Sequence, residues 1–281
     1  MNSVYCVDMQ FEARQVIKSL PPFHGARWSA WLRFACFQAA LRIDEIVSAL
    51  LPLRHGTARI TPGECLMLRL LVPPNALPVL PRMVRAMLEM PPRGEFCGRS
   101  LHFVGFREGI DGTPLITSEL TPQTVLPLTA ARLADRIVVA QQWERWSVRF
   151  SAPLRLTLPA GEKKGADGVR RFCDARFFRQ DGALSHMLQH VRLLAPAVCG
   201  TDIRLQDVRL RWEDMRYNRE RTVALGGVIG EICAAGHPDA ETARRLVLGE
   251  YLGAGKNGRF GLGFWRLFGP DASPLRENGN T

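Results

Sequence analysis

One histidine and two arginines near the N-terminus have the side chains needed for proton transfer and for stabilising an anion. His24 stands directly before a segment with helical periodicity, and Arg27 and Arg42 follow it. The ordinary pKa of histidine, about 6.5, suits either a general acid or a general base. In a continuous helix, Arg27 lies one turn on and Arg42 about four turns on, so both could reach a common groove. We therefore take His24, Arg27 and Arg42 as candidate catalytic residues.

Two alternatives to a catalytic histidine remain open. His24 could instead be a loop histidine that caps the helix or packs near "PPF" (residues 21–23). In the second alternative the arginines supply electrostatic stabilisation, and the geometry of the bound substrate does the rest. Arg27 and Arg42 are then the catalytic residues.

A glycine-rich segment near the C-terminus, "GAGKNGRFGLGFW" (253–265), is a second candidate site. A dinucleotide fingerprint needs its glycines after a strand and before a helix, and a P-loop needs Gly-Lys-Ser or Gly-Lys-Thr; neither fits. The functional interpretation is a loop whose backbone N–H groups approach phosphates closely, with added positive charge. The alternative is a turn used only for tight packing. The candidate residues are Gly253, Gly255, Lys256, Arg259, Gly261 and Gly263.

Basic residues in three further segments could contact the phosphates of a nucleic acid. The alternative for the longest segment is a solvated helix face. A tyrosine among them could stack on a base or merely fill a sheet face. The candidates are Arg33, Lys163, Lys164, Arg170, Arg171, Arg176, Arg179, Arg216, Tyr217, Arg219 and Arg221.

Composition and charge favour an anionic partner in the cytoplasm. The 281 residues carry a net charge of +10, which favours nucleic acid, anionic membrane or acidic protein as a partner. The seven cysteines form no Cys-x-x-Cys pair, a pattern typical of reduced thiols. We expect no signal peptide and no membrane span. His186 and His190 stand four residues apart, but no carboxylate or cysteine cluster supports a metal site, so we expect neither metal nor cofactor.

Hydrophobic periodicity predicts alternating strands and helices in the first half of the chain. Strands are predicted at about 3–14, 63–73 and 99–109, and helices at about 25–50 and 76–90. A core-facing stripe marks the first helix: Trp28, Leu32, Ala35, Cys36 and Ala39. Strand, helix, strand, helix, strand in this order fits an α+β domain.

The second half has the order β-α-β-β-α-β, which is that of a ferredoxin-like fold. We predict a strand at 146–159, a helix at 175–196, two strands around a turn at "ALGGVIG" (224–230), a helix capped by Asp239, and a closing strand at 260–268. The first half is interpretable as a degenerate copy of this second half. We therefore predict an α+β protein of two tandem ferredoxin-like, RRM-like domains, residues 1–143 and 144–281.

Three segments of the second half resemble a known family. Gly253-Ala254-Gly255, five residues, and Gly261-Leu262-Gly263 resemble the signature of the repeat-associated RNA-binding (RAMP) superfamily of CRISPR systems. "WEDMRYNRERTVALGGVIGEI" (212–232) is similar to a segment of CRISPR repeat endoribonucleases, and "VRFSAPLRL" (148–156) to the strand that opens their C-terminal domain. The resemblance covers about 146–267. The N-terminal half matches loosely, through "FHGARWSAWLR", which leaves a divergent subtype such as a type IV system open.

The resemblance implies a metal-independent endoribonuclease that cuts the repeats of a precursor CRISPR RNA. In the family, the 2′-hydroxyl attacks its own phosphate and gives a 2′,3′-cyclic phosphate. The enzyme often stays on the repeat hairpin and joins other subunits of the interference complex, a role in antiviral defence. One alternative is a non-catalytic RNA-binding subunit of the same superfamily, and another is an unrelated basic structural or ribosome-associated protein.

Overall fold

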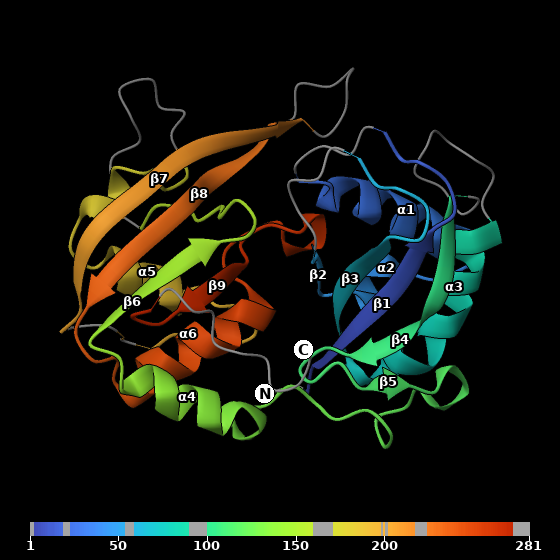
Figure 1. Ribbon diagram of the computed structural model, residues 1–281, viewed down its shortest axis with the longest axis horizontal. Helices are drawn as coiled ribbons and strands as arrows, with labels where there is room; N and C mark the ends of the chain where they lie inside the picture. Colours follow the sequence, from blue (N-terminus) through green and yellow to red (C-terminus); the bar gives the residue numbers. More distant parts are fainter. Residues whose placement is uncertain are drawn as a thin grey trace. The chain divides into compact units, whose positions relative to one another are not determined.

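The computed structural model describes residues 3–18, 23–53, 59–89, 100–159, 171–197, 199, 202–216 and 224–271. Contacts between residues divide them into two units (Figure 1). The N-terminal unit holds residues up to Leu128 together with Arg259–Gly261, and the C-terminal unit holds Thr129–Gly258 and the residues from Leu262 on. The expected domain boundary between residues 143 and 144 stays a prediction.

The N-terminal unit is one five-stranded antiparallel sheet with helices, in the strand order β2-β3-β1-β4-β5. Its first four strands follow the ferredoxin-like order, with a helix after the first strand and another after the third. The elements are β1 (Tyr5–Ala13), α1 (Gly25–Gln38), α2 (Ile43–Ile46), β2 (Ala49–Pro52), β3 (Cys65–Val72), the 3₁₀ helix η1 (Pro74–Val79), α3 (Leu80–Glu89), β4 (Leu101–Glu108), β5 (Pro114–Leu115) and η2 (Thr117–Glu119).

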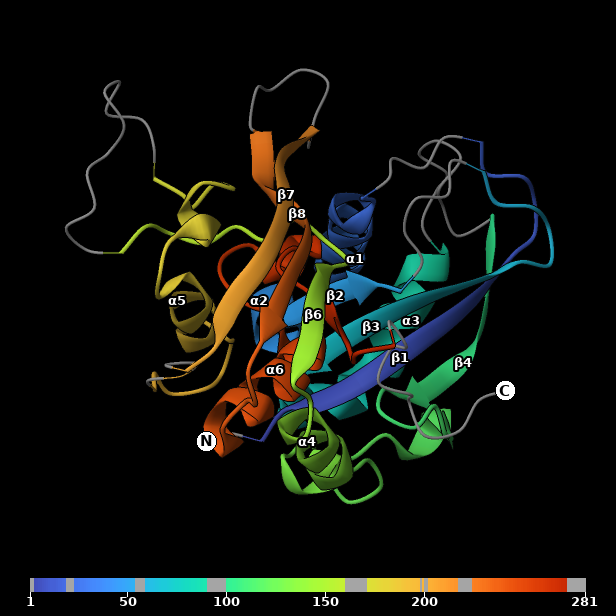
Figure 2. The ribbon, with the colours of Figure 1, turned by 60° about the vertical axis from the view of Figure 1, so that its left-hand side comes forward.

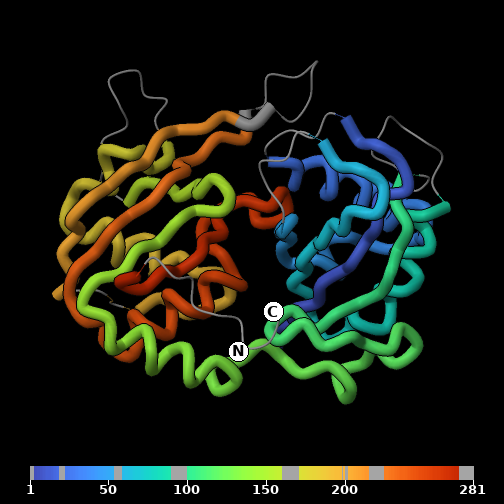
Figure 3. The backbone as a smooth tube through the Cα atoms, viewed as in Figure 1, coloured from blue at the N-terminus to red at the C-terminus, as the bar shows by residue number. Residues whose placement is uncertain are grey.

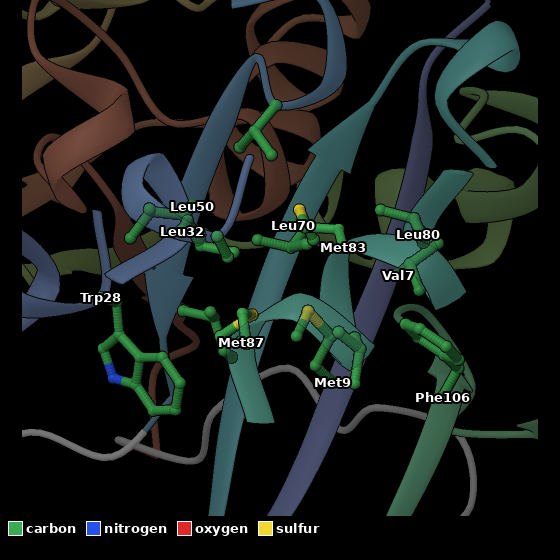
Figure 4. Close-up of a cluster of buried hydrophobic side chains, with 14 of the residues drawn as sticks. Val7, Met9, Trp28, Leu32, Leu50, Leu70, Leu80, Met83, Met87 and Phe106 are labelled. Carbon is green, nitrogen blue, oxygen red and sulfur yellow. The ribbon is translucent and has the colours of Figure 1, made fainter. Parts of the chain in front are cut away.

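The core of this unit lies where α1 and α3 cover the sheet (Figure 4). Every residue of the predicted stripe on α1 is buried, because this face packs against the strands and α3. The helices contribute Trp28, Leu32, Leu80, Met83 and Met87 to this core. The strands contribute Val7, Met9, Leu70 and Phe106.

The first helix is shorter than its periodicity predicts. It ends at Gln38, and Ala40 takes a left-handed conformation with φ +51°. The Leu41 N–H donates to the Cys36 carbonyl at 2.7 Å and the Ala40 N–H to the Phe37 carbonyl at 3.1 Å, which closes the helix as a Schellman motif. Alanine stands where glycine is usual, so no residue type marks the end of this helix. The prediction of one helix over 25–50 was wrong, because α2 and β2 occupy its second half.

The C-terminal unit repeats this arrangement, with the strand order β7-β8-β6-β9. β7 and β8 form a long hairpin that runs beside β6 (Figures 2 and 3). The elements are η3 (Ala131–Leu133), α4 (Ala134–Gln141), β6 (Arg145–Phe150), η4 (Phe177–Arg179), α5 (Ala183–Gln189), β7 (Arg204–Arg216), β8 (Ala224–Ala235), α6 (Ala240–Leu252) and β9 (Trp265–Phe268). The 3₁₀ helix η5 (Gly258–Phe260) lies between α6 and β9. The predicted fold, two ferredoxin-like units in an α+β protein, is confirmed.

Three predictions within this unit need correction. "ALGGVIG" lies inside β8 and is no turn, since Gly226 and Gly227 pair with Asp214 and Glu213 of β7. The predicted helix at 175–196 is split into η4 and α5, because Gly182 has φ +80°. β6 ends at Phe150, well before residue 159. In contrast, the Asp239 cap is confirmed: its side chain accepts from the Thr242 N–H at 2.8 Å.

Candidate nucleic-acid interface

His24 forms the buried start of α1. It is the N-cap residue and only 3% of its surface is exposed. Its Nδ1 accepts a hydrogen bond from the Trp28 indole at 3.0 Å, so the proton of the neutral imidazole sits on Nε2. Its carbonyl accepts from the N–H groups of Arg27 and Trp28. The ring is thus fixed in the protein interior, as in the structural alternative for this residue.

The exposed side of α1 carries Arg27 and Arg33, and the tip of the glycine-rich loop packs onto this helix. Arg259–Gly261 belong to the N-terminal unit. A Cβ on Gly25 would lie 2.3 Å from the Phe260 carbonyl oxygen, so the loop touches the helix backbone at its first residue. The Arg33 guanidinium lies 5.6 Å from the centre of the Phe260 ring, a cation–π distance. We call Arg27, Arg33 and Phe260 the α1 surface.

The other two predicted cations near α1 already have acidic partners. Arg259 pairs with Asp44 and donates to the carbonyls of Val47 at 3.0 Å and Asp44 at 3.3 Å. Arg42 lies beyond the end of α1 and pairs with Glu45 at 2.9 Å, with 79% of its side chain exposed. The expectation that Arg27 and Arg42 share one helix was therefore wrong. Arg259 holds the loop tip on the N-terminal unit.

A half-buried arginine organises the part of the glycine-rich loop in the C-terminal unit. The Arg192 guanidinium donates to the carbonyls of Leu252, Ala254, Gly255 and Leu262 at 2.7–3.2 Å. These carbonyls come from both ends of the loop, so one side chain ties the ends together. Burial lowers the pKa of Arg192 to about 9, which still leaves it charged at neutral pH.

The glycines of this loop make room for that arginine and for the backbone. A Cβ on Gly253 would lie 2.2 Å from Arg192 Nη1, and one on Gly263 would lie 2.0 Å from the Ala254 carbonyl oxygen. Both residues have positive φ, +65° and +82°. Packing alone therefore accounts for these glycines.

Five backbone N–H groups of the loop already donate to carbonyls within the protein. Those of Gly253, Ala254, Gly255, Lys256 and Gly263 donate to the carbonyls of Gly249, Gly263, His190, Arg155 and Pro153. These five amides are therefore engaged within the protein, and phosphate binding by the loop stays a prediction. The Lys256 side chain is exposed, as a contact to an anion requires.

Arg192 lies in the segment that the sequence predicts as a single helix over 175–196. The structure places it after α5, facing the loop, because α5 ends at Gln189 and the chain turns. The partners of Arg192 lie 60 to 70 positions further along the sequence, and no local sequence pattern predicts such contacts. An isolated arginine between apolar residues, in "QHVRLLAP", was the only available signal.

The remaining candidates fall into two groups. Arg171, Arg176 and Arg179 are exposed, as phosphate contacts require. Arg216 is the last residue of β7 and pairs through its backbone with Ala224. Lys163, Lys164, Arg170, Tyr217, Arg219 and Arg221 lie outside the described residues.

The paired histidines of α5 are both engaged in hydrogen bonds. His186 Nε2 lies 2.8 Å from the Thr157 carbonyl oxygen and His190 Nδ1 lies 2.8 Å from the His186 carbonyl oxygen. Across the described ranges, no group of three or more histidine, cysteine, aspartate or glutamate side chains could hold a metal ion. No helix in those ranges is long and apolar enough to cross a membrane.

Comparison with known proteins identifies the fold. No family model matches the sequence, and no curated protein matches it. A chain of a partial Cas6-RT-Cas1–Cas2 complex matches with a TM-score of 0.68 and 13% identity, over 96% of this chain and 46% of that one. A Cas6 of Thermus thermophilus matches at 0.51 and 14% identity, over 95% and 99% of the two chains. A RAMP protein binding different RNA substrates matches at 0.50 and 11% identity, over 94% and 99%.

The chain therefore has the fold of Cas6 and RAMP proteins, and the resemblance noted in the sequence is confirmed at the level of the fold. It spans less than half of the chain in the Cas6-RT-Cas1–Cas2 complex. In both sheets the four strands follow one another across the sheet in the same order, β2-β3-β1-β4 and β7-β8-β6-β9.

Proposed function

We propose that this protein is a Cas6-type endoribonuclease that cleaves CRISPR repeat RNA without a metal and stays bound to the repeat hairpin. The observation that carries the proposal is the fold match to Cas6, which covers 96% of the chain at the highest of the three TM-scores. The net charge of +10 and the exposed arginines support an RNA partner. Other CRISPR subunits are proposed partners.

In the proposed reaction the 2′-hydroxyl attacks the adjacent phosphorus, the bond to the 5′ oxygen of the next nucleotide breaks, and a 2′,3′-cyclic phosphate forms. The proton of the 2′-hydroxyl passes to water and the leaving oxygen takes one from water. Arg27 is the proposed catalytic cation, because it is exposed one turn from the start of α1 and can stabilise the charge on the phosphorane. Arg33 and Lys256 are proposed phosphate contacts.

His24 is proposed as a positioning residue in this account. Its burial and its bond to Trp28 favour the arginine-based alternative over a histidine that contacts RNA. Arg42 is a weaker candidate for a catalytic cation, since Glu45 pairs with it.

The experiment is cleavage of the repeat RNA encoded beside the gene, with a random RNA of equal length as control. The proposal predicts one cut in the repeat, a product with a cyclic phosphate end, and no cut in the control RNA. Tight binding of the repeat without any cut would instead support the second candidate, a non-catalytic RAMP-type subunit that holds guide RNA. The observation that favours this second candidate is the burial of His24, because a buried histidine does not contact RNA. Equal binding of both RNAs would contradict both.

A further inference from the structure

On the face of the C-terminal sheet opposite α6, three of the four strands contribute an arginine to one row. In the strand register, Arg209 of β7 faces Glu231 of β8, Glu231 faces Arg149 of β6, and Arg149 faces Arg266 of β9. Residues directly opposite one another on neighbouring strands share a face of the sheet. These four side chains therefore form one line across the sheet, which we call the arginine row.

The opposite face of this sheet is the one that packs against α6. Trp265 and Leu267 of β9 alternate with Arg266 and are buried, and the Trp265 indole donates to the Leu246 carbonyl of α6 at 3.1 Å. Trp146, Val148 and Phe150 of β6 are buried in the same way. The arginine row consequently lies on the face turned away from this core. The side chains of Arg209 and Arg149 are 73% and 54% exposed.

Among the described residues of these strands, arginines outnumber carboxylates on this face. Arg149 and Arg266 stand directly opposite each other, an arrangement of like charges that destabilises a sheet. Arg204, Arg145 and Arg211 lie on the same face, and its carboxylates are Asp207, Glu213 and Glu231. The exposed pairs that arginines make with them, such as Arg209 with Asp207 at 2.6 Å, are weak and exchangeable. An anionic partner would relieve the repulsion.

The line of residues next to the row contains one carboxylate and otherwise short or apolar side chains. The next line across the sheet is Asp207, Cys233, Ser147 and Phe268. The Arg149 guanidinium lies 4.6 Å from the centre of the Phe268 ring, which holds it over the sheet. A sheet face with cations and an aromatic ring suits a splayed single strand of RNA, whereas a duplex needs elements that reach into its grooves.

We propose that the arginine row binds the backbone of an unpaired RNA strand that crosses the C-terminal sheet. This inference rests on the proposed function, because it takes RNA as the ligand, and it adds a binding surface in the C-terminal unit to the α1 surface of the N-terminal unit. Glu231 is the single carboxylate in the row and limits its affinity for RNA.

The test measures binding of an unstructured oligouridylate and of a blunt repeat hairpin to the full chain at several salt concentrations. The double variant Arg149→Gln/Arg266→Gln should bind oligouridylate roughly tenfold more weakly, with a salt slope lower by about 1.4, since each phosphate contact contributes about 0.7 for single strands. Binding of the blunt hairpin should change less than about twofold. Glu231→Gln should strengthen oligouridylate binding about threefold, a gain that misfolding cannot produce.

The matched control is Arg59→Gln/Arg85→Gln, which removes the same charge from exposed positions of the N-terminal unit. An equal loss in this control, or unchanged oligouridylate binding in the row variant, overturns the proposal and leaves the row to an acidic protein or to no ligand. If the row variant loses oligouridylate binding while the wild type fails to cut the hairpin, the row stands and the proposed nuclease function falls.

Discussion

The guanidinium of Arg192 occupies the space that a side chain at Gly253 would need. Nη1 lies 2.2 Å from the position of a Cβ on Gly253, and Nη2 lies 2.9 Å from that of a Cβ on Gly263. The two glycines and the arginine therefore form one packing unit, in which four loop carbonyls accept hydrogen bonds from one guanidinium.

Gly253→Ala should lower the free energy of unfolding by about 3 kcal/mol or more, because positive-φ strain adds to overpacking against Arg192. Gly182→Ala is the control: φ there is +80°, but nothing lies within 4 Å of the added Cβ, so only about 1 kcal/mol is expected. Urea unfolding of both variants measures the difference. Equal losses would show that strain alone, and not Arg192, requires the glycine.

Arg192→Lys should lower the free energy of unfolding by about 3 kcal/mol, since an ammonium has three donors and lacks the planar fork that reaches four carbonyls. Affinity for repeat RNA should fall as well, because Lys256 belongs to the loop whose ends Arg192 holds together. Unfolding in urea and RNA titration measure the two effects. A lysine variant of wild-type stability would mean that the carbonyls find other donors.

Ala40→Gly should raise the free energy of unfolding by about 1 kcal/mol, because glycine takes the left-handed conformation at φ +51° without the cost that a Cβ imposes. Ala39→Gly is the control, at φ −84°, where glycine should bring no gain. Thermal and urea unfolding check both variants. A loss of stability in Ala40→Gly would contradict the Schellman motif.

His24→Ala should lower the free energy of unfolding by about 1–2 kcal/mol, because the buried Trp28 N–H loses its acceptor, yet cleavage by folded protein should stay within about threefold. Arg27→Ala should reduce the cleavage rate roughly 100-fold with little change in stability. Single-turnover cleavage beside urea unfolding separates the two effects. A loss of cleavage in folded His24→Ala would restore the histidine as a proton-transfer residue.

The sequence predicted the fold but not the contacts within the glycine-rich loop. Periodicity located the buried stripe of α1, and element order indicated two ferredoxin-like units. The end of α1 escaped prediction because Ala40 takes a conformation typical of glycine. Gly226 and Gly227 were predicted in a turn, but they lie in β8. A Cβ on Gly226 would clash with Asp214 and Trp212, and a Cβ on Gly227 would clash with the Leu154 carbonyl.

The candidate site could be predicted only in part. Residue type and spacing located Arg27, Arg33 and the glycines, whereas the burial of His24 and the carbonyls around Arg192 depend on contacts between distant segments. The arginine row depends on strand register, which brings Arg149 and Arg266 together across 117 positions of the sequence.

The central claim is tested most directly by cleavage of repeat RNA in EDTA, with and without a 2′-deoxy substitution at the nucleotide that precedes the cut. The account predicts full cleavage of the unmodified RNA in EDTA, a 2′,3′-cyclic phosphate on the upstream product, and no cleavage of the 2′-deoxy RNA, because its attacking oxygen is missing. Cleavage that needs an added metal, or that persists on the 2′-deoxy RNA, would contradict it.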